Sequence, residues 1–497
     1  MKKFIVLLCC AMLTVRLFAA TMDSRVRNVP QELAEAVFEQ PKEKLPVLVR
    51  TLISGVSGDA AKVKVLHDWI CDNIAYDTDV FTVGVWKQDY ETVLKKRRAI
   101  CSGYTNLMNE MCRLAKVESI GIEGYSKGFG YRGYLEEECD HAWNAVKIGG
   151  RWQLIDVTWD AGTVEWTTFV KRYSTEWLNL TPEQFIYSHL PEKDEYQYLR
   201  QPRTKEQFVA EPYIPGIFFQ YGLSLGKAAP GYRNEIEEDA SYELKLAKSN
   251  ILILSDLVDK DTGEFIRNAT WAERTGNAVR ATFAVPDMGK YQGRFLAKNR
   301  GEGKNPFFFS IAEFEQDLLP RVQGLLDEKK ITQKEADFFE PSYFKVEENG
   351  RYYFAEDLFD RPRNVAVTKI LTLLEKTQQY EEVLAFELAA SGDYEGYGRG
   401  VLHFPSPYGA YEETANTHLI SPNSGVLEGG AEQEFVIDTK DFSSLGVVID
   451  GKLSVFAKNA KTGRCTFSLT VPSAGRLVIC GTKNGKNYQW LWEYIVE

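Results

Sequence analysis

Three short segments hold the residue types that an attack on an amide bond requires. They are Ala99-Ile100-Cys101-Ser102-Gly103-Tyr104, His141-Ala142-Trp143-Asn144 and Asp156-Val157-Thr158-Trp159-Asp160. A cysteine nucleophile needs a histidine that takes its proton and a carboxylate that orients the histidine. The candidate catalytic residues are therefore Cys101, His141 and Asp156.

Cys101 is expected at the start of a helix. The apolar residues that follow it recur at three- and four-residue steps, which predicts an amphipathic helix: Tyr104, Leu107, Met108, Met111 and Leu114. The positive end of such a helix favours a thiolate, the reactive form of cysteine. The alternative is a buried cysteine that merely begins a helix.

His141 and Asp156 are expected on one face of an antiparallel sheet. Strands are predicted over 119–125, 142–148 and 152–159, with Gly149-Gly150 as a hairpin turn. In that register His141 faces Thr158, and Asp156 is its diagonal neighbour. Asp156 could then hold one ring nitrogen of His141 and leave the other for Cys101.

Other residues near these motifs have structural alternatives. In the same register Trp143 shares the face of His141, where it walls a cleft or packs, whereas Trp159 and Asn144 point to the other side. His67 shares a helix face with apolar residues and is interpreted as a core residue. No histidine stands at ligand spacing from the acidic run Glu136-Glu137-Glu138, and no calcium-loop spacing is evident, so we expect neither a metal nor a cofactor.

Composition limits the classes of partner. The chain has 497 residues, 44% hydrophobic and 26% charged, with a formal net charge of -11 and no long basic run. Nucleic acid is therefore an unsuitable partner, because phosphate binding needs a basic surface. Its length predicts several domains.

The first twenty residues have the parts of a secretory signal. Met1-Lys2-Lys3 precedes an apolar stretch and a small-residue exit at Ala19-Ala20. We expect export to the periplasm or the cell surface. An N-terminal membrane anchor and lipidation at Cys9 or Cys10 are the alternatives, and no other stretch is apolar enough to span a membrane.

The pattern along the chain predicts five segments. These are a signal peptide (1–20), an α+β domain of helices followed by an antiparallel sheet (21–200), a β-sandwich module (201–325), an uncertain mixed segment (326–415) and a second β module (416–497). A weak repeat, 285–290 against 471–476, supports two related β modules. If Pro472-Ser473 centres a hairpin, Cys465 faces Cys480, as a disulfide or as two buried thiols.

These motifs together resemble the transglutaminase-like superfamily, and within it the bacterial kyphoscoliosis-peptidase type. The likeness rests on Ala99–Tyr104, His141–Asn144 and Trp152–Trp159. It implies a papain-like α+β core followed by immunoglobulin-like sandwich modules. It also implies that Cys101 is the nucleophile, His141 the general acid/base and Asp156 the orienting carboxylate. An oxyanion-stabilising side chain is expected upstream of the cysteine, where Trp86 and Gln88 are candidates.

The resemblance leaves three functions open. The first is a cysteine peptidase or amidase that hydrolyses amides of protein or peptide substrates through a thioester. The second is a cross-linking transglutaminase, which differs only in using an amine as acceptor. The third is a non-catalytic envelope binding or scaffold protein that works through its β modules. Hydrolysis is the favoured hypothesis.

Overall fold

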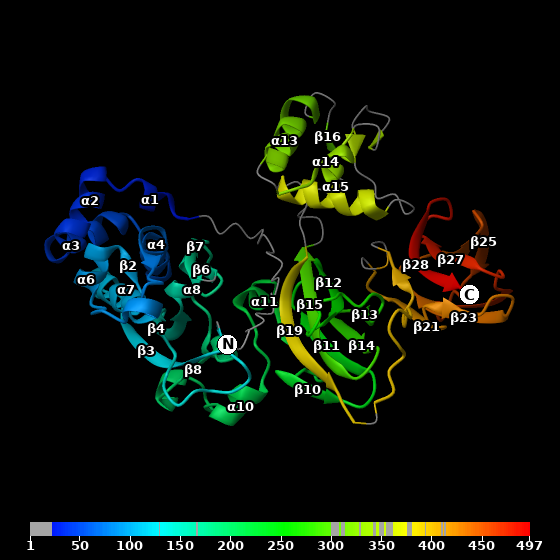
Figure 1. The fold of residues 1–497 in the computed structure, drawn as a ribbon, viewed down its shortest axis with the longest axis horizontal. Helices are drawn as coiled ribbons and strands as arrows, with labels where there is room; N and C mark the ends of the chain where they lie inside the picture. The colour runs from blue at the N-terminus through cyan, green and yellow to red at the C-terminus, as the bar shows by residue number, and fades with distance from the viewer. Residues whose placement is uncertain are drawn as a thin grey trace, which may run out of the picture.

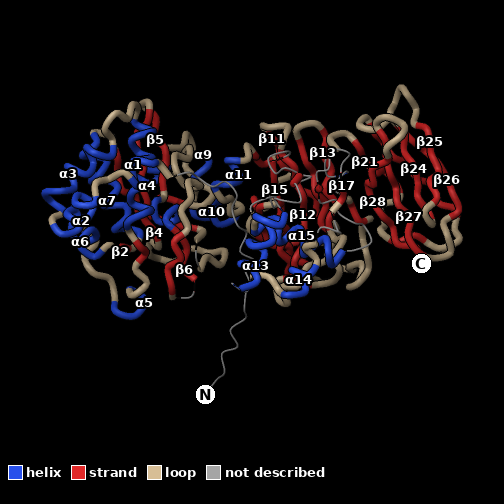
Figure 2. The backbone as a smooth tube through the Cα atoms, turned by 90° about the horizontal axis from the view of Figure 1, so that it is seen from above, coloured by secondary structure: helices blue, strands red, loops and turns tan. Residues whose placement is uncertain are grey.

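The computed structural model places three bodies in a row, as both views show (Figures 1 and 2). A mixed α+β core lies at one end, a β module lies in the middle and a second β module lies at the other end. The structure describes residues 22–128, 130–165, 167–299, 308–309, 314–327, 330–340, 344–346, 352–353, 361–374, 380–392, 394–408, 411 and 414–497. The predicted signal peptide lies outside the described residues.

The core domain is built on a four-stranded antiparallel sheet in the order β5-β4-β3-β8. Its strands are β3 (Ser119–Ser126), β4 (His141–Ile148), β5 (Arg151–Ile155) and β8 (His189–Pro191). Two short sheets join β1 (Ala75–Tyr76) to β2 (Arg98–Ala99) and β6 (Gly162–Glu165) to β7 (Thr168–Lys171). This helix-then-sheet order confirms the predicted α+β class.

Helices precede the sheet and share one apolar core with it. They are α1 (Ser24–Arg27), α2 (Gln31–Glu39), α3 (Pro41–Leu52), α4 (Asp59–Asn73), α5 (Val80–Val83), α6 (Tyr90–Lys96) and α7 (Cys101–Ala115). After β5 come α8 (Val157–Ala161), α9 (Pro182–Phe185), α10 (Lys205–Ala210) and α11 (Gly216–Gln220). Because Leu107, Met108 and Met111 are fully buried, the apolar face predicted for α7 is the one that packs.

The hairpin between β4 and β5 has the predicted register, but it is shorter than predicted. Asn144 pairs with Ile155 and Ile148 pairs with Arg151, on either side of the Gly149-Gly150 turn. The strand ends at Ile155, because the Asp156 carboxylate accepts hydrogen bonds from the next N–H groups and caps α8. The expectation that Thr158 faces His141 across the sheet is therefore wrong.

The middle module contains two sheets around one core. One has the order β10-β19-β15-β12 and the other β13-β14-β11-β9. Their strands are β9 (Leu223–Leu225), β10 (Arg233–Ile236), β11 (Ala240–Leu246), β12 (Ile251–Asp259), β13 (Thr270–Thr275), β14 (Ala278–Phe283), β15 (Gly289–Asn299) and β19 (Glu381–Ala390). Strand β19 comes from the segment 326–415, so part of that segment completes this module.

Helices inserted between β15 and β19 have a small core of their own. They are α13 (Leu319–Asp327), α14 (Gln333–Asp337) and α15 (Arg361–Leu373), and they lie above the middle module (Figure 1). A short sheet accompanies them, made of β16 (Phe308–Phe309), β17 (Lys345–Val346) and β18 (Tyr352–Tyr353). The chain therefore leaves the middle module and returns to it.

The C-terminal module also has two sheets around one core. One consists of β20 (Ser406–Pro407), β22 (Val426–Leu427), β24 (Ser444–Ile449), β25 (Lys452–Ala457), β27 (Gly475–Thr482) and β28 (Tyr488–Val496). The other consists of β21 (Thr417–Ser421), β23 (Glu432–Thr439) and β26 (Arg464–Thr470). The all-β character predicted for the modules is confirmed.

The predicted hairpin at Pro472-Ser473 is wrong. Strand β26 pairs with β23, whereas β27 pairs with β24 and β28, so the turn carries the chain from one sheet to the other. The repeat segment near Gly289 likewise connects β14 to β15, which belong to different sheets. Cys465 and Cys480 are both buried free thiols.

None of the described helices has the length and apolar character needed to cross a membrane.

Candidate active site

Cys101 is the first residue of α7, and it is partly exposed. Ile100 is the extended residue before the helix, and its N–H donates to Gln88 Oε1 over 3.1 Å. The first N–H groups of a helix have no partner within the helix, so they point toward the space in front of Cys101. The predicted position of the thiol at a positive helix end is thus observed.

His141 begins β4 and makes a 2.6 Å hydrogen bond from Nε2 to Asp156 Oδ2. Burial alone disfavours the imidazolium, but the Asp156 charge and hydrogen bonds to Asp156 and Cys101 outweigh it and raise the pKa of His141 to about 10. His141 and Asp156 are therefore joined by a hydrogen bond, and the Cys101 thiol contributes to the raised pKa of His141; that these three residues are catalytic stays a prediction.

Asp156 is held from two sides and is fully buried. Its Oδ1 accepts the N–H groups of Thr158 at 2.8 Å and Trp159 at 3.1 Å. Burial by itself would raise the pKa of this carboxyl, yet the charge and hydrogen bonds of His141 and His189 hold it well below the usual range. Asp156 is thus a fixed anion that orients His141.

Aromatic rings enclose the His141 imidazole. Trp159 stacks on it with ring centroids 5.3 Å apart, and Trp143 lies at 6.0 Å. The expectation that Trp159 points away is wrong, because the helical turn after Asp156 carries its indole back toward His141. Trp143 is fully buried, and Asn144 bonds to α7 through Thr105 O and Asn109 Oδ1, a structural contact.

Sequence reasoning missed His189. This residue begins β8, is fully buried, and hydrogen-bonds through Nε2 to Asp156 Oδ2 over 3.2 Å. Strand β8 joins the sheet beside β3, a pairing that no local pattern of the sequence fixes. The available signal was only that His189 is one of five histidines in the chain.

His141, Asp156 and His189 also have the spacing of a metal-binding set, with ligand atoms within 4.8 Å of one another. Both imidazoles, however, direct Nε2 at the same carboxylate oxygen over hydrogen-bond distances. The opposite oxygen is occupied by backbone N–H groups. The geometry is that of a hydrogen-bonded group of side chains.

The two candidate oxyanion donors are bound within the protein. Trp86 Nε1 donates to Asp77 Oδ2 over 2.5 Å, and Gln88 Nε2 donates to the Trp86 carbonyl over 3.1 Å. Gln88 also lies against Gly103, where an added Cβ would come within 2.3 Å of its Oε1. Gln88 thus holds the segment on either side of Cys101, through the Ile100 N–H and the contact with Gly103.

Tyr76 is a further residue that the sequence analysis did not single out. It ends β1 and pairs with Ala99, two residues before Cys101. Burial, followed by the charges of Cys101 and Asp156, raises the pKa of Tyr76 to about 12. The Tyr76 hydroxyl is therefore protonated at neutral pH.

His67 is a buried residue, as predicted, and it anchors α8. Its Nε2 lies 3.1 Å from Asp160 Oδ2, and its Nδ1 lies 3.1 Å from Asp68 Oδ1. Asp160 also accepts the Trp177 N–H and the Ser174 hydroxyl. This second network fixes the turn that carries Asp156.

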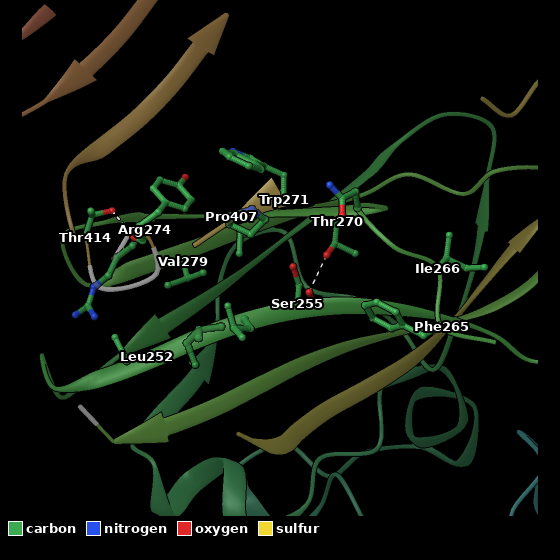
Figure 3. Close-up of a pocket in the computed structure, with 15 residues that line it drawn as sticks. Leu252, Ser255, Phe265, Ile266, Thr270, Trp271, Arg274, Val279, Pro407 and Thr414 are labelled. Carbon is green, nitrogen blue, oxygen red and sulfur yellow. Dashed lines mark hydrogen bonds between the residues drawn. The ribbon is translucent and has the colours of Figure 1, made fainter. Parts of the chain in front are cut away.

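A cavity of about 150 Å³ lies elsewhere, between the two β modules (Figure 3). Trp271 and Phe265 from the middle module and Pro407 and Tyr411 from the following segment contribute to its lining. Trp271 stacks on Tyr411 at 5.1 Å, so the modules share an aromatic junction. None of the core-domain residues that the structure describes lines this cavity.

Part of the chain is similar to known proteins. Residues 47–157 match the family model described as the transglutaminase-like superfamily. The Kyphoscoliosis peptidase of Mus musculus is 35% identical over 282 residues, covering 55% of this chain and 40% of that protein. The Homo sapiens protein of the same name is 35% identical over 191 residues, covering 37% and 28%. The chain thus spans less than half of either relative.

A solved structure of a TGase is also similar to part of the chain. It is 18% identical, covers 30% of this chain and 38% of its own, and has a TM-score of 0.20.

Proposed function

Because the chain carries a domain of the transglutaminase-like superfamily, we propose that it is a cysteine enzyme that attacks amide bonds of protein or peptide substrates. The observation that carries this proposal is the 2.6 Å bond between His141 and an Asp156 carboxylate locked by backbone N–H groups. Such a pair presents a correctly oriented imidazole to a thiol.

The proposed reaction has two steps. The Cys101 thiolate attacks the amide carbonyl carbon, and the His141 imidazolium gives its proton to the departing amine as the C–N bond breaks. The product is a thioester on Cys101. Water then attacks this thioester while His141 takes a proton from it, which releases the carboxylic acid and restores the thiol.

Hydrolysis is proposed over amine transfer because the relatives are named peptidases. The enzyme is proposed to be exported, on the strength of residues 1–20, and to act at the cell envelope. The β modules are proposed to position the core against its substrate. One contact supports this: Tyr131, in the loop before His141, packs edge-on against Tyr232 of the middle module at 5.0 Å.

Thiol alkylation tests the proposed pair directly. Cys101 should react with iodoacetamide fastest among the thiols between pH 5 and 9, and His141→Ala should slow it or shift its reaction to higher pH. Cys139 is the internal control: it is also partly exposed, and burial raises its pKa. The catalytic proposal fails if Cys101 is alkylated no faster than Cys139 and if His141→Ala does not change the alkylation rate of Cys101. A binding role through the β modules then replaces it.

The acyl acceptor is tested with a glutamine dipeptide, with and without hydroxylamine. A hydrolase releases ammonia at the same rate in both cases and forms little hydroxamate. Hydroxamate as the main product would instead identify a cross-linking transglutaminase. Cys101→Ser provides the blank for both reactions.

A further inference from the structure

Four donors surround the Asp156 carboxylate. Oδ1 accepts two backbone N–H groups, and Oδ2 faces Nε2 of His141 and Nε2 of His189. An ionised carboxylate offers about four acceptor positions. His189 therefore completes the set, and it does so from a different strand than His141.

The surroundings of His189 keep it neutral. Phe185 stacks on its ring with centroids 4.0 Å apart, and Trp159 lies at 4.4 Å. Burial lowers the pKa of His189 to about 4, although the Asp156 charge opposes this. At neutral pH the ring thus has a single proton to share between two nitrogens.

The position of that proton follows from the partners. Asp156 can only accept, so His189 Nε2 must carry the hydrogen. His189 Nδ1 then has a lone pair, so the single hydrogen of the Ser188 hydroxyl points at this nitrogen, 2.8 Å away, in preference to the Phe185 carbonyl oxygen at 3.1 Å. A directed chain results, from Ser188 to His189 to Asp156, and it meets the bond from His141 at one oxygen.

We propose that His189 is a positioning residue for the Cys101–His141 pair: by donating a hydrogen bond to Asp156 Oδ2, it limits the pull of this carboxylate on the His141 proton. The inference rests on the proposed function and adds to it a residue that tunes the general acid. With His189 in place, the imidazolium remains acidic enough to give its proton to the leaving amine.

Other groups near His141 do not take over this task. Asp140 precedes it in the chain, and its side chain accepts the Ser126 N–H at 2.8 Å. Burial raises the pKa of Tyr76, so its hydroxyl stays protonated. Among the described side chains, Asp156 is hydrogen-bonded to His141 over 2.6 Å, and His189 is the side-chain donor that shares Asp156 with it.

The test compares His189→Phe, which keeps a ring but has no donor, with His189→Gln, which retains an N–H near the Nε2 position. Without the donor, Asp156 holds the His141 proton more tightly. The pKa of His141, read from its ring-nitrogen chemical shifts above pH 8, should then rise by about one unit, while amide turnover falls about tenfold. His189→Gln should stay close to wild type in both.

A higher pKa of His141 together with a lower turnover distinguishes tuning from damage, because a distorted site would weaken the bond to Asp156 and lower the pKa of His141. Equal losses in both variants, or no change in His189→Phe, would overturn the proposal. Ser188→Ala is the milder variant, and a smaller change of the same sign is expected from it.

Nitrogen NMR of labelled histidine tests the chain independently of any activity. His189 should show one protonated and one bare nitrogen, unchanged from pH 5.5 to 9. Two protonated nitrogens would overturn the inference. If the wild type shows this tautomer and rapid Cys101 alkylation but no amide turnover, the proposed function fails while the hydrogen-bond assignment stands.

Discussion

The Trp159 indole stacks on the His141 imidazole, with ring centroids 5.3 Å apart and planes inclined by 26°. Trp159 is fixed in turn by an edge contact with Trp177 at 4.9 Å. The negative face of an aromatic ring favours a cation above it. The stack therefore stabilises the protonated form of His141, whose side chain is 7% exposed.

Replacing Trp159 should weaken the thiolate–imidazolium pair. A cation–π contact in a desolvated site contributes about 1–2 kcal/mol, so Trp159→Leu should slow alkylation of Cys101 at pH 6 by about tenfold. Trp159→Phe should have a smaller effect. Trp152→Leu is the matched control, because Trp152 stacks on Tyr198 instead. Equal effects from Trp152 and Trp159 would argue for general destabilisation.

The stability of the core should be greatest near pH 6.5. The raised pKa of His141 contributes stability that is complete below about 6.5 and is lost as the pH rises through about 10. The lowered pKa of His189 acts in the other direction: its contribution is present above about 6.5 and is lost as the pH falls to about 4. Each group changes the unfolding free energy by about 1.4 kcal/mol per pH unit within its window.

Urea unfolding at pH 4.5, 5.5, 6.5 and 8 measures this profile. His189→Phe should reduce the loss of stability between pH 6.5 and 4.5. It should leave the loss of stability above pH 6.5 unchanged, because the pKa of His189 affects stability only on the acid side. His418→Ala, at a half-buried position of the C-terminal module and outside the core domain, should leave both slopes unchanged. A wild-type stability that does not fall between pH 6.5 and 4.5 would contradict the neutral, buried state of His189.

Removing His67 should destabilise the core strongly. His67→Leu leaves the buried carboxylates of Asp68 and Asp160 without their shared partner, which costs about 3–5 kcal/mol in comparable buried pairs. Because Asp160 also fixes α8, Cys101 alkylation should become less dependent on His141. Denaturant unfolding and alkylation rates measure the two effects, and a loss below about 1 kcal/mol would show that the network is dispensable.

Gly103 should not tolerate a side chain. A Cβ there would lie 2.3 Å from Gln88 Oε1 and 2.8 Å from the Ala99 Cβ, so Gly103→Ala must displace the segment before Cys101. We expect a loss of about 1–3 kcal/mol and slower alkylation. Gly324→Ala is the control: it lies within α13 with open space around it, and should stabilise that helix by up to about 1 kcal/mol. Thermal unfolding of both variants measures these two changes in stability.

Local patterns accounted for much of the site. The periodicity after Cys101 predicted α7, and the Gly149-Gly150 turn fixed the β4–β5 register, because both depend on neighbours in the chain. The strand predicted to continue through Trp159 failed at Asp156. There a carboxylate that can cap a helix competes with strand pairing, and the capped turn brought Trp159 onto His141.

The sequence by itself determined the residue types of the site, their order and the α+β-then-β organisation, since hydrophobic period and turn residues are local signals. Only the tertiary structure decided that His189 shares Asp156, that His67 holds α8, and that β19 returns to the middle module. These are contacts between residues far apart in the chain. They follow from which strands pair and which faces pack, and no local spacing specifies that.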